Sequence, residues 1–143
     1  MPSGANSAPR KKVSGSPPTF FLDRQIGKYI VANALRKAGA IVEVHDDHFP
    51  QVTEDVVWIP AIASRGWVLI TRDQNIRYNA LERAAYVSAR LRGFIVTGKG
   101  MSGGEFAELM VACLPRMTRK VSRAQGPLLY TISRGGSFTR MKF

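Results

Sequence analysis

Two aspartates directly follow short apolar runs that have the composition of buried strands. Asp23 comes after the run 20–22 (FFL), and Asp73 comes three residues after the run 67–70 (WVLI). Apolar runs of this length favour strands that are buried on both faces, as in a parallel sheet. Open α/β sheets bind ligands at the carboxyl ends of their strands. The two aspartates are therefore candidate site residues at one end of a sheet.

Most of the acidic residues fall where a strand is expected to end or a helix to begin. Eight of the ten do so: Asp23, Asp46, Asp47, Glu54, Asp55, Asp73, Glu82 and Glu105. Helix capping explains the three glutamates, because an acid in a first helical turn stabilises the helix by roughly 0.3–1 kcal/mol. Capping does not explain Asp23 and Asp73, nor the position of Asp55 beside them.

Carboxylates that crowd together repel each other and raise one another's pKa, so such a group requires a cation or bound protons. Oxygen-only ligands suit Mg²⁺ or Mn²⁺. Four basic residues, which could bind substrate phosphates, belong to the same loops: Arg24, Lys28, Arg72 and Arg77. Carboxylates, a hard metal ion and basic residues together predict a metal-dependent phosphodiesterase.

The charge of the chain is concentrated at its two ends. The net charge is +11, of which +3 lies in residues 1–18, +1 in 19–108 and +7 in 109–143. This distribution favours a polyanionic partner, nucleic acid before a membrane, although basic tails that only aid solubility remain an alternative. The single cysteine, Cys113, is expected in the core. Because no 18-residue apolar segment occurs, we expect a soluble cytoplasmic protein without a membrane partner.

The order of apolar runs and helical patterns predicts the organisation of the chain. Residues 1–18 are expected to form a disordered basic arm, and 19–143 a single domain. Four strand–helix units are expected, with helix starts at Ile26, Thr53, Asn79 and Ser102; the last helix should end at Pro115. Residues 128–133 and 137–142 then favour a β-hairpin over another βαβ unit. The predicted fold class is a three-layer α/β/α domain with a mainly parallel sheet and a C-terminal β-hairpin.

Three stretches carry a family resemblance: FFLDRQIG, HFPQVTEDVVWIP and ITRDQNIRYNALERAA. In this order and spacing they resemble the PIN-like domain family, in its branch of VapC-type toxins. The resemblance implies an Mg²⁺- or Mn²⁺-dependent endoribonuclease, the toxin of a type II toxin–antitoxin pair with a cognate antitoxin. Asp23, Asp55 and Asp73 match the catalytic, metal-holding acids of the family. Asp47 and Glu82 match positions that are often acidic, and are further candidate metal ligands.

Two other functions remain open, a catalytically silent nucleic-acid-binding protein of this fold and a nuclease that acts on DNA. A homodimer is also left open. His45 and His48 are expected to orient loops or face solvent, and Trp58 and Trp67 to lie in the core. The basic segment 116–143 is expected to grip RNA or an antitoxin beside the carboxylates.

Overall fold

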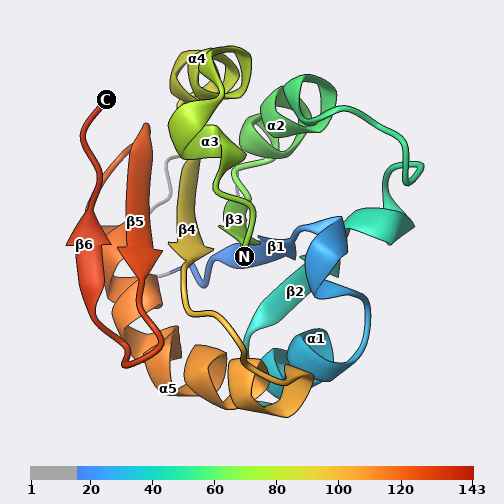
Figure 1. The fold of residues 1–143 in the computed structure, drawn as a ribbon, viewed down its shortest axis with the longest axis vertical. Coiled ribbons are helices and arrows are strands. Elements are labelled where there is room, and N and C mark those ends of the chain that lie inside the picture. Colours follow the sequence, from blue (N-terminus) through green and yellow to red (C-terminus); the bar gives the residue numbers. More distant parts are fainter. Residues whose placement is uncertain (1–15) are drawn as a thin grey trace, which may run out of the picture.

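The computed structural model describes residues 16–143, so the expected basic arm at 1–18 lies almost wholly outside the described residues. One six-stranded sheet forms the centre, in the order β2-β1-β3-β4-β5-β6 (Figure 1). The strands are β1 (Thr19–Leu22), β2 (Ile41–Val44), β3 (Val68–Thr71), β4 (Arg92–Val96), β5 (Leu128–Ile132) and β6 (Phe138–Arg140). The helices are α1 (Ile30–Lys37), α2 (Asp55–Ser64), α3 (Asn75–Tyr78), α4 (Ala80–Ala89) and α5 (Gly103–Ser122).

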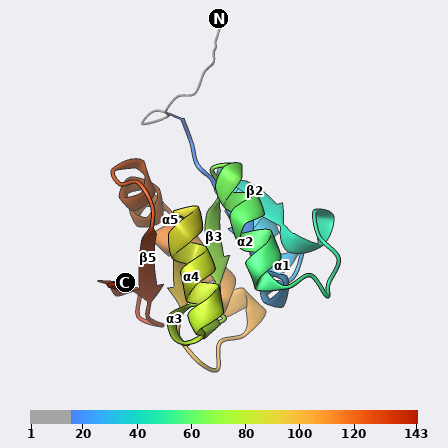
Figure 2. The same cartoon turned by 90° about the horizontal axis from the view of Figure 1, so that it is seen from above.

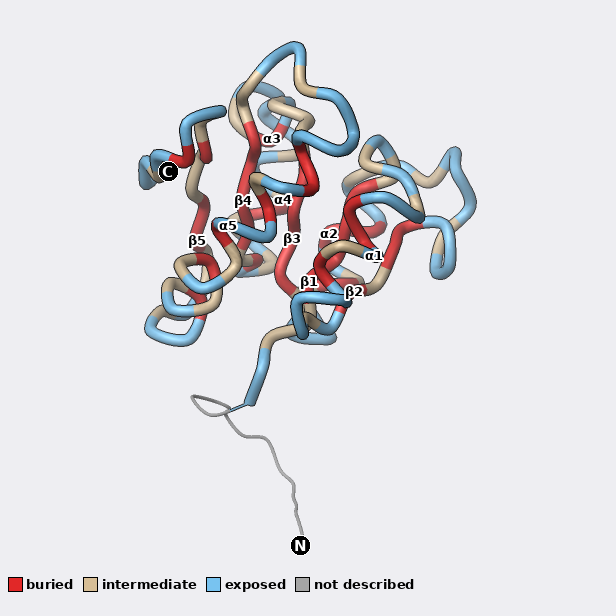
Figure 3. The backbone as a smooth tube through the Cα atoms, turned by 90° about the horizontal axis from the view of Figure 1, so that it is seen from below, coloured by how far each residue is buried: buried red, intermediate tan, exposed pale blue. Residues whose placement is uncertain are grey.

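Helices cover both faces of the sheet. In Figure 1, α2, α3 and α4 lie above the sheet and α1 and α5 below it, and Figure 2 shows α2 and α4 in front of β3. Because side chains alternate along a strand, Phe20 and Leu22 enter the core beneath the sheet, whereas Phe21 enters the core above it. The strands, which are mostly buried in Figure 3, therefore separate two apolar cores. The predicted three-layer α/β fold is confirmed.

The strand order reverses between β1 and β3. From β1 the chain crosses through α1 to β2 on one side, and from β2 it crosses through α2 to β3 on the other side. Both pairs are parallel, so the carboxyl ends of β1 and β3 lie next to each other. Such a reversal leaves a crevice in which α/β proteins bind ligands. Asp23 and Asp73 follow these two strands.

The C-terminal region contains a parallel strand that the sequence analysis did not predict. β5 pairs with β4 in parallel, with Arg92 opposite Leu128, and β6 then pairs with β5 antiparallel. The hairpin exists, but α5 and β5 also complete a further βαβ unit. The expectation that the hairpin replaces such a unit was wrong.

The last helix does not end at Pro115 as predicted but continues to Ser122. Pro115 has no backbone N–H to donate, and it lies on the exposed side of the helix. A proline in a helix interior lowers the stability of the helix by about 3 kcal/mol. Two buried side chains, Met117 and Val121, continue the apolar face past it. Burial of each contributes up to about 1.5–3 kcal/mol, which outweighs the cost of the proline.

The start of the first helix also differs from prediction, and one of the two predicted capping boxes is incomplete. The segment from Ile26 does not open a helix, because a 3₁₀ turn at Arg24–Ile26 ends at Gly27 and α1 starts at Ile30. Asn79 caps α4 through the N–H groups of Leu81 and Glu82, but the Glu82 side chain makes no return bond to Asn79. The second predicted capping box, Ser102 with Glu105, is present in full. Among residues 16–143, no helix is both long enough and apolar enough to cross a bilayer.

Candidate metal centre

Asp23 is a buried carboxylate at the carboxyl end of β1. Only 3% of the residue is exposed. Its Oδ1 accepts a 2.6 Å hydrogen bond from the backbone N–H of Arg24, and its Oδ2 accepts one of 2.7 Å from the Thr71 hydroxyl at the end of β3. Burial raises the pKa of Asp23, the Thr71 bond opposes this shift, and the charge of Asp55 adds to it. Asp23 is therefore held rigidly, with its charge only partly compensated.

Asp55 reaches the same crevice from the first turn of α2. The indole N–H of Trp58, one turn later, donates a 2.9 Å hydrogen bond to Asp55 Oδ1. The Arg24 guanidinium lies 3.6 Å from the same oxygen, and also donates to the Thr53 carbonyl over 2.8 Å. Oδ1 is thus held by one hydrogen bond and one ion pair, and no hydrogen bond to Oδ2 of Asp55 is present among the described residues.

Asp73 is oriented by the turn that follows β3. Its backbone N–H donates to the Thr71 hydroxyl over 2.9 Å, and its Oδ1 accepts a 2.9 Å bond from the Asn75 N–H at the start of α3. Thr71 therefore binds both Asp23 and Asp73. This single buried hydroxyl fixes the relative position of the two strand-end aspartates.

Glu82 completes the group from the first turn of α4. One ligand oxygen from each of Asp55, Asp73 and Glu82 lies within 4.8 Å of the others. The Oε1 of Glu82 is buried and has no hydrogen-bond partner among the described residues. Burial, the nearby Asp55 carboxylate and the negative charges of Asp73 and Asp23 raise the pKa of Glu82 to about 7.

The donor set fits a hard divalent cation. All four side chains offer carboxylate oxygens, the ligands that Mg²⁺ and Mn²⁺ prefer. The buried Glu82 oxygen lacks a donor, and a cation would supply the missing positive charge. Asp23 lies outside the closest three-residue set, but the charge of Asp55 raises the pKa of Asp23, and the charge of Asp23 raises the pKa of Glu82. We call Asp23, Asp55, Asp73 and Glu82 the carboxylate site.

Comparison with known proteins identifies the family of this chain. Residues 18–98, more than half of the 143, match the family described as PIN like domain. The chain belongs to the PIN-like domain family. It is also 32% identical over 117 residues to the "Putative ribonuclease VapC45" of Mycobacterium tuberculosis, in an alignment that covers 79% of this chain and 84% of that protein. No solved structure matches the chain.

Asp47 of the PIN-like domain does not join the other acids. Its carboxylate lies 3.4 Å from the Lys28 ammonium, and both side chains are largely exposed. Asp47 follows β2, at the far side of β1 from β3. The structure therefore brings three of the five predicted metal ligands within 4.8 Å of one another, with Asp23 at the end of the adjacent β1. It places Asp47 in a surface ion pair with a predicted substrate-binding residue.

The predicted substrate-binding arginines differ in how far they are already engaged. Arg24 binds Asp55 and the Thr53 carbonyl. Arg72 donates to the Gly98 carbonyl over 2.5 Å and stacks on the Phe106 ring at 5.1 Å. Arg77 donates to the Gln74 side chain over 3.0 Å and lies over the ring of the exposed Tyr78. Arg72 and Arg77 flank Asp73 in the sequence and lie at the carboxyl end of the sheet.

Two side chains that position the aspartates were not predicted. Trp58 was expected only as a core residue; it is buried as predicted, but it also donates to Asp55. Its spacing of three residues from Asp55 was the available signal, since such residues are neighbours on a helix. For Thr71, the available signal was a polar residue directly after an apolar run. His45, expected to orient a loop or face solvent, is buried against Phe21 and Phe49.

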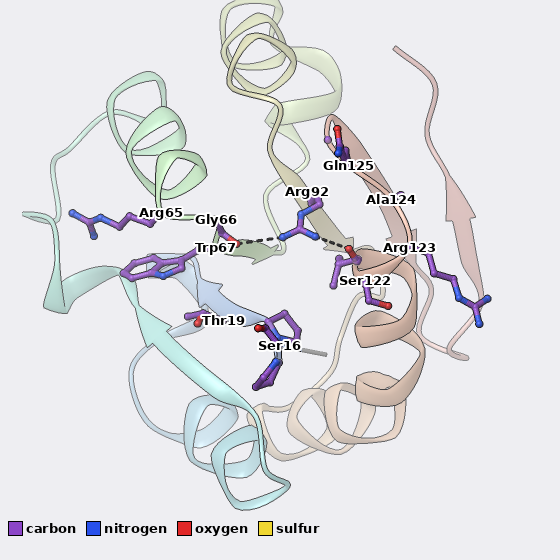
Figure 4. A pocket seen from close by; sticks show the side chains of 14 residues that line it. Ser16, Thr19, Arg65, Gly66, Trp67, Arg92, Ser122, Arg123, Ala124 and Gln125 are labelled. Atoms are coloured by element: carbon purple, nitrogen blue, oxygen red, sulfur yellow. Dashed lines mark hydrogen bonds between the residues drawn. The ribbon is translucent and has the colours of Figure 1, made fainter. Parts of the chain in front are cut away.

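The opposite end of the sheet has a different character. A cavity of about 670 Å³ lies there, between the start of β1 and the end of α5 (Figure 4). Arg92 lies at its centre and donates to the carbonyls of Gly66 and Val121, while Arg65 and Arg123 point away from it. No acidic residue of the described part of the chain lines this cavity. It is separated from the carboxylate site by the length of the strands.

We expected the basic C-terminal segment to lie beside the carboxylates, but part of it lies elsewhere. α5 starts at the carboxyl end of the sheet and runs to the opposite end, so Arg119 and Arg123 lie far from the carboxylate site. Arg116 donates to the Gly136 carbonyl over 2.8 Å. Lys120 lies over the rings of Tyr130 and Phe138, at 4.6 and 5.3 Å. These two side chains thus help to join α5 to the hairpin.

Proposed function

We propose that this PIN-like protein is a metal-dependent endoribonuclease, the toxin of a type II toxin–antitoxin pair. One observation carries the proposal, namely that carboxylate oxygens from Asp55, Asp73 and Glu82 converge within 4.8 Å at the reversal of strand order, with Asp23 buried beside them. The relative from Mycobacterium tuberculosis, which is named a ribonuclease, supports RNA as the substrate. Its VapC name supports a cognate antitoxin as partner.

Asp55, Asp73 and Glu82 would hold the cation, and Asp23 would add to the negative potential there. A bound Mg²⁺ or Mn²⁺ supplies Lewis acidity toward a phosphodiester and lowers the pKa of a water molecule. The chain itself contributes position. Thr71 fixes Asp23 relative to Asp73, and Trp58 with Arg24 fixes Asp55. We assign Arg24 to this positioning, because its guanidinium is already bonded to Asp55 and Thr53.

Arg72, Arg77 and Lys28 are the proposed contacts to RNA phosphates. Arg72 and Arg77 belong to the segment that carries Asp73, and Lys28 follows the turn that carries Asp23. They would offset the repulsion between the carboxylate site and a polyanion. Because the site takes its affinity for RNA from these residues and the metal together, binding should weaken when either is removed.

Cleavage of labelled single-stranded RNA and DNA by the full chain tests the proposal. We expect RNA to be cut at internal bonds with Mg²⁺ or Mn²⁺, cutting to stop in EDTA, and activity to return when excess metal is restored. Cutting of DNA alone would indicate the DNA nuclease. Binding of RNA without any cutting, by a folded protein supplied with metal, would indicate the catalytically silent protein. Asp73→Asn serves as the inactive control.

A further inference from the structure

A groove lies beside the carboxylate site, at the same end of the sheet but toward the α1 and α5 layer. Its volume is about 280 Å³. One wall is the segment between β1 and α1, and the other is the start of α5. The lining includes Lys28, Tyr29, Ile30, Arg72, Met101 and Phe106. We call it the Tyr29 groove.

The groove offers a large aromatic and aliphatic surface to solvent. Tyr29 is 68% exposed and Ile30 is 61% exposed, although both are large hydrophobic residues. They are neighbours in the sequence, and both line the groove. Single exposed apolar residues are ordinary, but an adjacent exposed pair beside a cavity is typical of a binding surface.

The charged residues in the groove are all positive. Lys28 and Arg72 line it, and no carboxylate of residues 16–143 does. Arg72 is held in place by the Gly98 carbonyl and by the Phe106 ring. Lys28 is paired only with Asp47, in an exposed ion pair that contributes little and that a phosphate could replace. A ligand with a flat apolar part and a negative charge is therefore complementary to the groove.

The groove is joined to the carboxylate site by two short stretches of chain. Asp23 precedes the 3₁₀ turn at Arg24–Ile26, whose end lines the groove. Arg72 lies between Thr71 and Asp73, so it belongs to both places. An RNA chain that has one phosphate at the carboxylate site can thus place the adjoining nucleotide in the groove.

We propose that the Tyr29 groove is a nucleotide subsite for single-stranded RNA, a role that rests on the proposed ribonuclease function. The base of a nucleotide next to the cleaved bond packs against Tyr29 and Ile30, and its phosphate binds Lys28 and Arg72. Only an unpaired base can turn out of a stack to reach an aromatic side chain. The groove therefore selects unpaired RNA and contributes to the choice of the bond that is cut.

Removal of the Tyr29 ring is the first test. Base stacking on an aromatic side chain contributes about 1–3 kcal/mol per base, which corresponds to roughly 5- to 150-fold in Kd. We expect Tyr29→Ala to weaken RNA binding by a factor in that range, and Tyr29→Trp to preserve it. Binding is measured by fluorescence anisotropy in the Asp73→Asn background. Because Tyr29 is exposed, both variants should fold normally. Equal affinity of the two variants would overturn the proposal.

Two adjacent glycines of α5 supply a matched test of the groove itself. A Cβ at Gly103 would lie 3.0 Å from Cδ1 of Ile30 and push that side chain, whereas a Cβ at Gly104 meets nothing closer than 4.0 Å. Alanine favours a helix at either position. We expect Gly103→Ala to weaken RNA binding while Gly104→Ala leaves it unchanged, with similar stability of both. Identical RNA affinity of the two variants would argue against the groove.

A scan with abasic nucleotides identifies the base that is bound. A base is removed at each position of the substrate in turn, and Kd is measured with Tyr29 and with Tyr29→Ala. At one position next to the cleaved bond, removal of the RNA base and removal of the Tyr29 ring should together weaken RNA binding no more than either change alone. Additive costs at every position would reject the subsite.

The outcome also separates this inference from the proposed function. If the wild-type protein cleaves no RNA, the proposed function fails. If the wild-type protein cleaves RNA and Tyr29→Ala does so with the same KM and the same choice of bond, only the subsite fails. Loss of binding to a protein partner in Tyr29→Ala, with unchanged RNA binding, would assign the groove to that partner and overturn the proposal.

Discussion

The hydroxyl of Thr71, in the last residue of β3, donates a 2.7 Å hydrogen bond to Oδ2 of Asp23, 48 residues earlier in the chain. Both residues are buried. A buried carboxylate without donors is costly, so this bond supports the charge on Asp23 as well as its orientation. Thr71 is a positioning residue, because it binds the carboxylate of Asp23 and the backbone N–H of Asp73.

Thr71→Val should therefore impair the carboxylate site without a change in side-chain shape. We expect a loss of stability of about 1–3 kcal/mol, because a buried hydrogen bond is left half made, and a higher pKa for Asp23. Thr71→Ser restores the hydroxyl and should recover most of the activity. Urea unfolding and the pH profile of RNA cleavage measure the two effects. An unchanged pH profile in Thr71→Val would contradict the role of this bond.

Loss of one carboxylate charge should abolish cleavage and stabilise the metal-free protein. We expect Asp73→Asn to lower kcat/KM by at least about a hundred-fold, since even outer partners of metal ligands contribute 10- to 100-fold. The amide oxygen can still accept from Asn75, so folding should persist. In EDTA the melting temperature should rise, because repulsion from Asp55 and Glu82 decreases. Glu105→Gln, at the exposed start of α5, is the matched control with normal activity.

Protons should compete with the metal at Glu82. Its pKa is raised from 4.5 to about 7, so the carboxyl is half protonated near neutral pH in the metal-free protein. Metal affinity should therefore fall as the pH drops below about 7, as measured by calorimetry with Mn²⁺. In Glu82→Gln the affinity should be lower and this pH dependence should largely disappear. A wild-type affinity that is constant between pH 6 and 8 would contradict this assignment.

The same group should make the metal-free protein less stable as the pH rises. The folded state binds the Glu82 proton more tightly than the unfolded state does, so the stability that it confers is present below pH 4.5 and is lost as the pH rises to about 7. The burial that raises the pKa of Asp23 acts in the same direction. In EDTA, Glu82→Gln should show a weaker decline than the wild type between these pH values. Excess Mg²⁺ should stabilise the wild-type protein at pH 8.

Arg119 and Arg123 should contribute to RNA binding without affecting the cleavage step. They are exposed, and no ion pair involves them among the described residues. Each phosphate contact that is lost lowers the log–log salt slope by about 0.7 for a single strand. Replacing both by glutamine should therefore lower the slope by about 1.4 for RNA long enough to reach them, with kcat unchanged. An unaltered slope would assign them to solubility or to a protein partner.

The strand-end aspartates were predictable because each follows an uninterrupted apolar run. Parallel strands place their carboxyl ends together, so Asp23 and Asp73 could be assigned to one site before the structure was known. Asp55 was a weaker candidate from the sequence, because an acid in a first helical turn also suits the helix dipole, and the family resemblance supported it. Glu82 was predicted both as a cap and as a ligand, and its side chain faces the other acids instead of Asn79.

Features set by tertiary packing were less predictable. Local rules end a helix before a proline, but the apolar face of α5 continues past Pro115 and decides its length. β5 looked like half of a local hairpin, yet its other side pairs with β4. Asp47 matched a family position in the sequence, but the strand order places it beyond β1, away from β3. Sequence spacing alone does not contain the strand order.

The two outer strands of the sheet also bear on how the protein behaves at high concentration. β2 and β6 each have one unpaired side, which can recruit a strand from another molecule and start aggregation. Both are short, with four and three residues. Glu43 interrupts β2, and Arg140, with Lys142 just beyond, places positive charge on β6. Pairing of two like edges, β2 with β2 or β6 with β6, would bring like charges together, which disfavours growth of the sheet through such contacts.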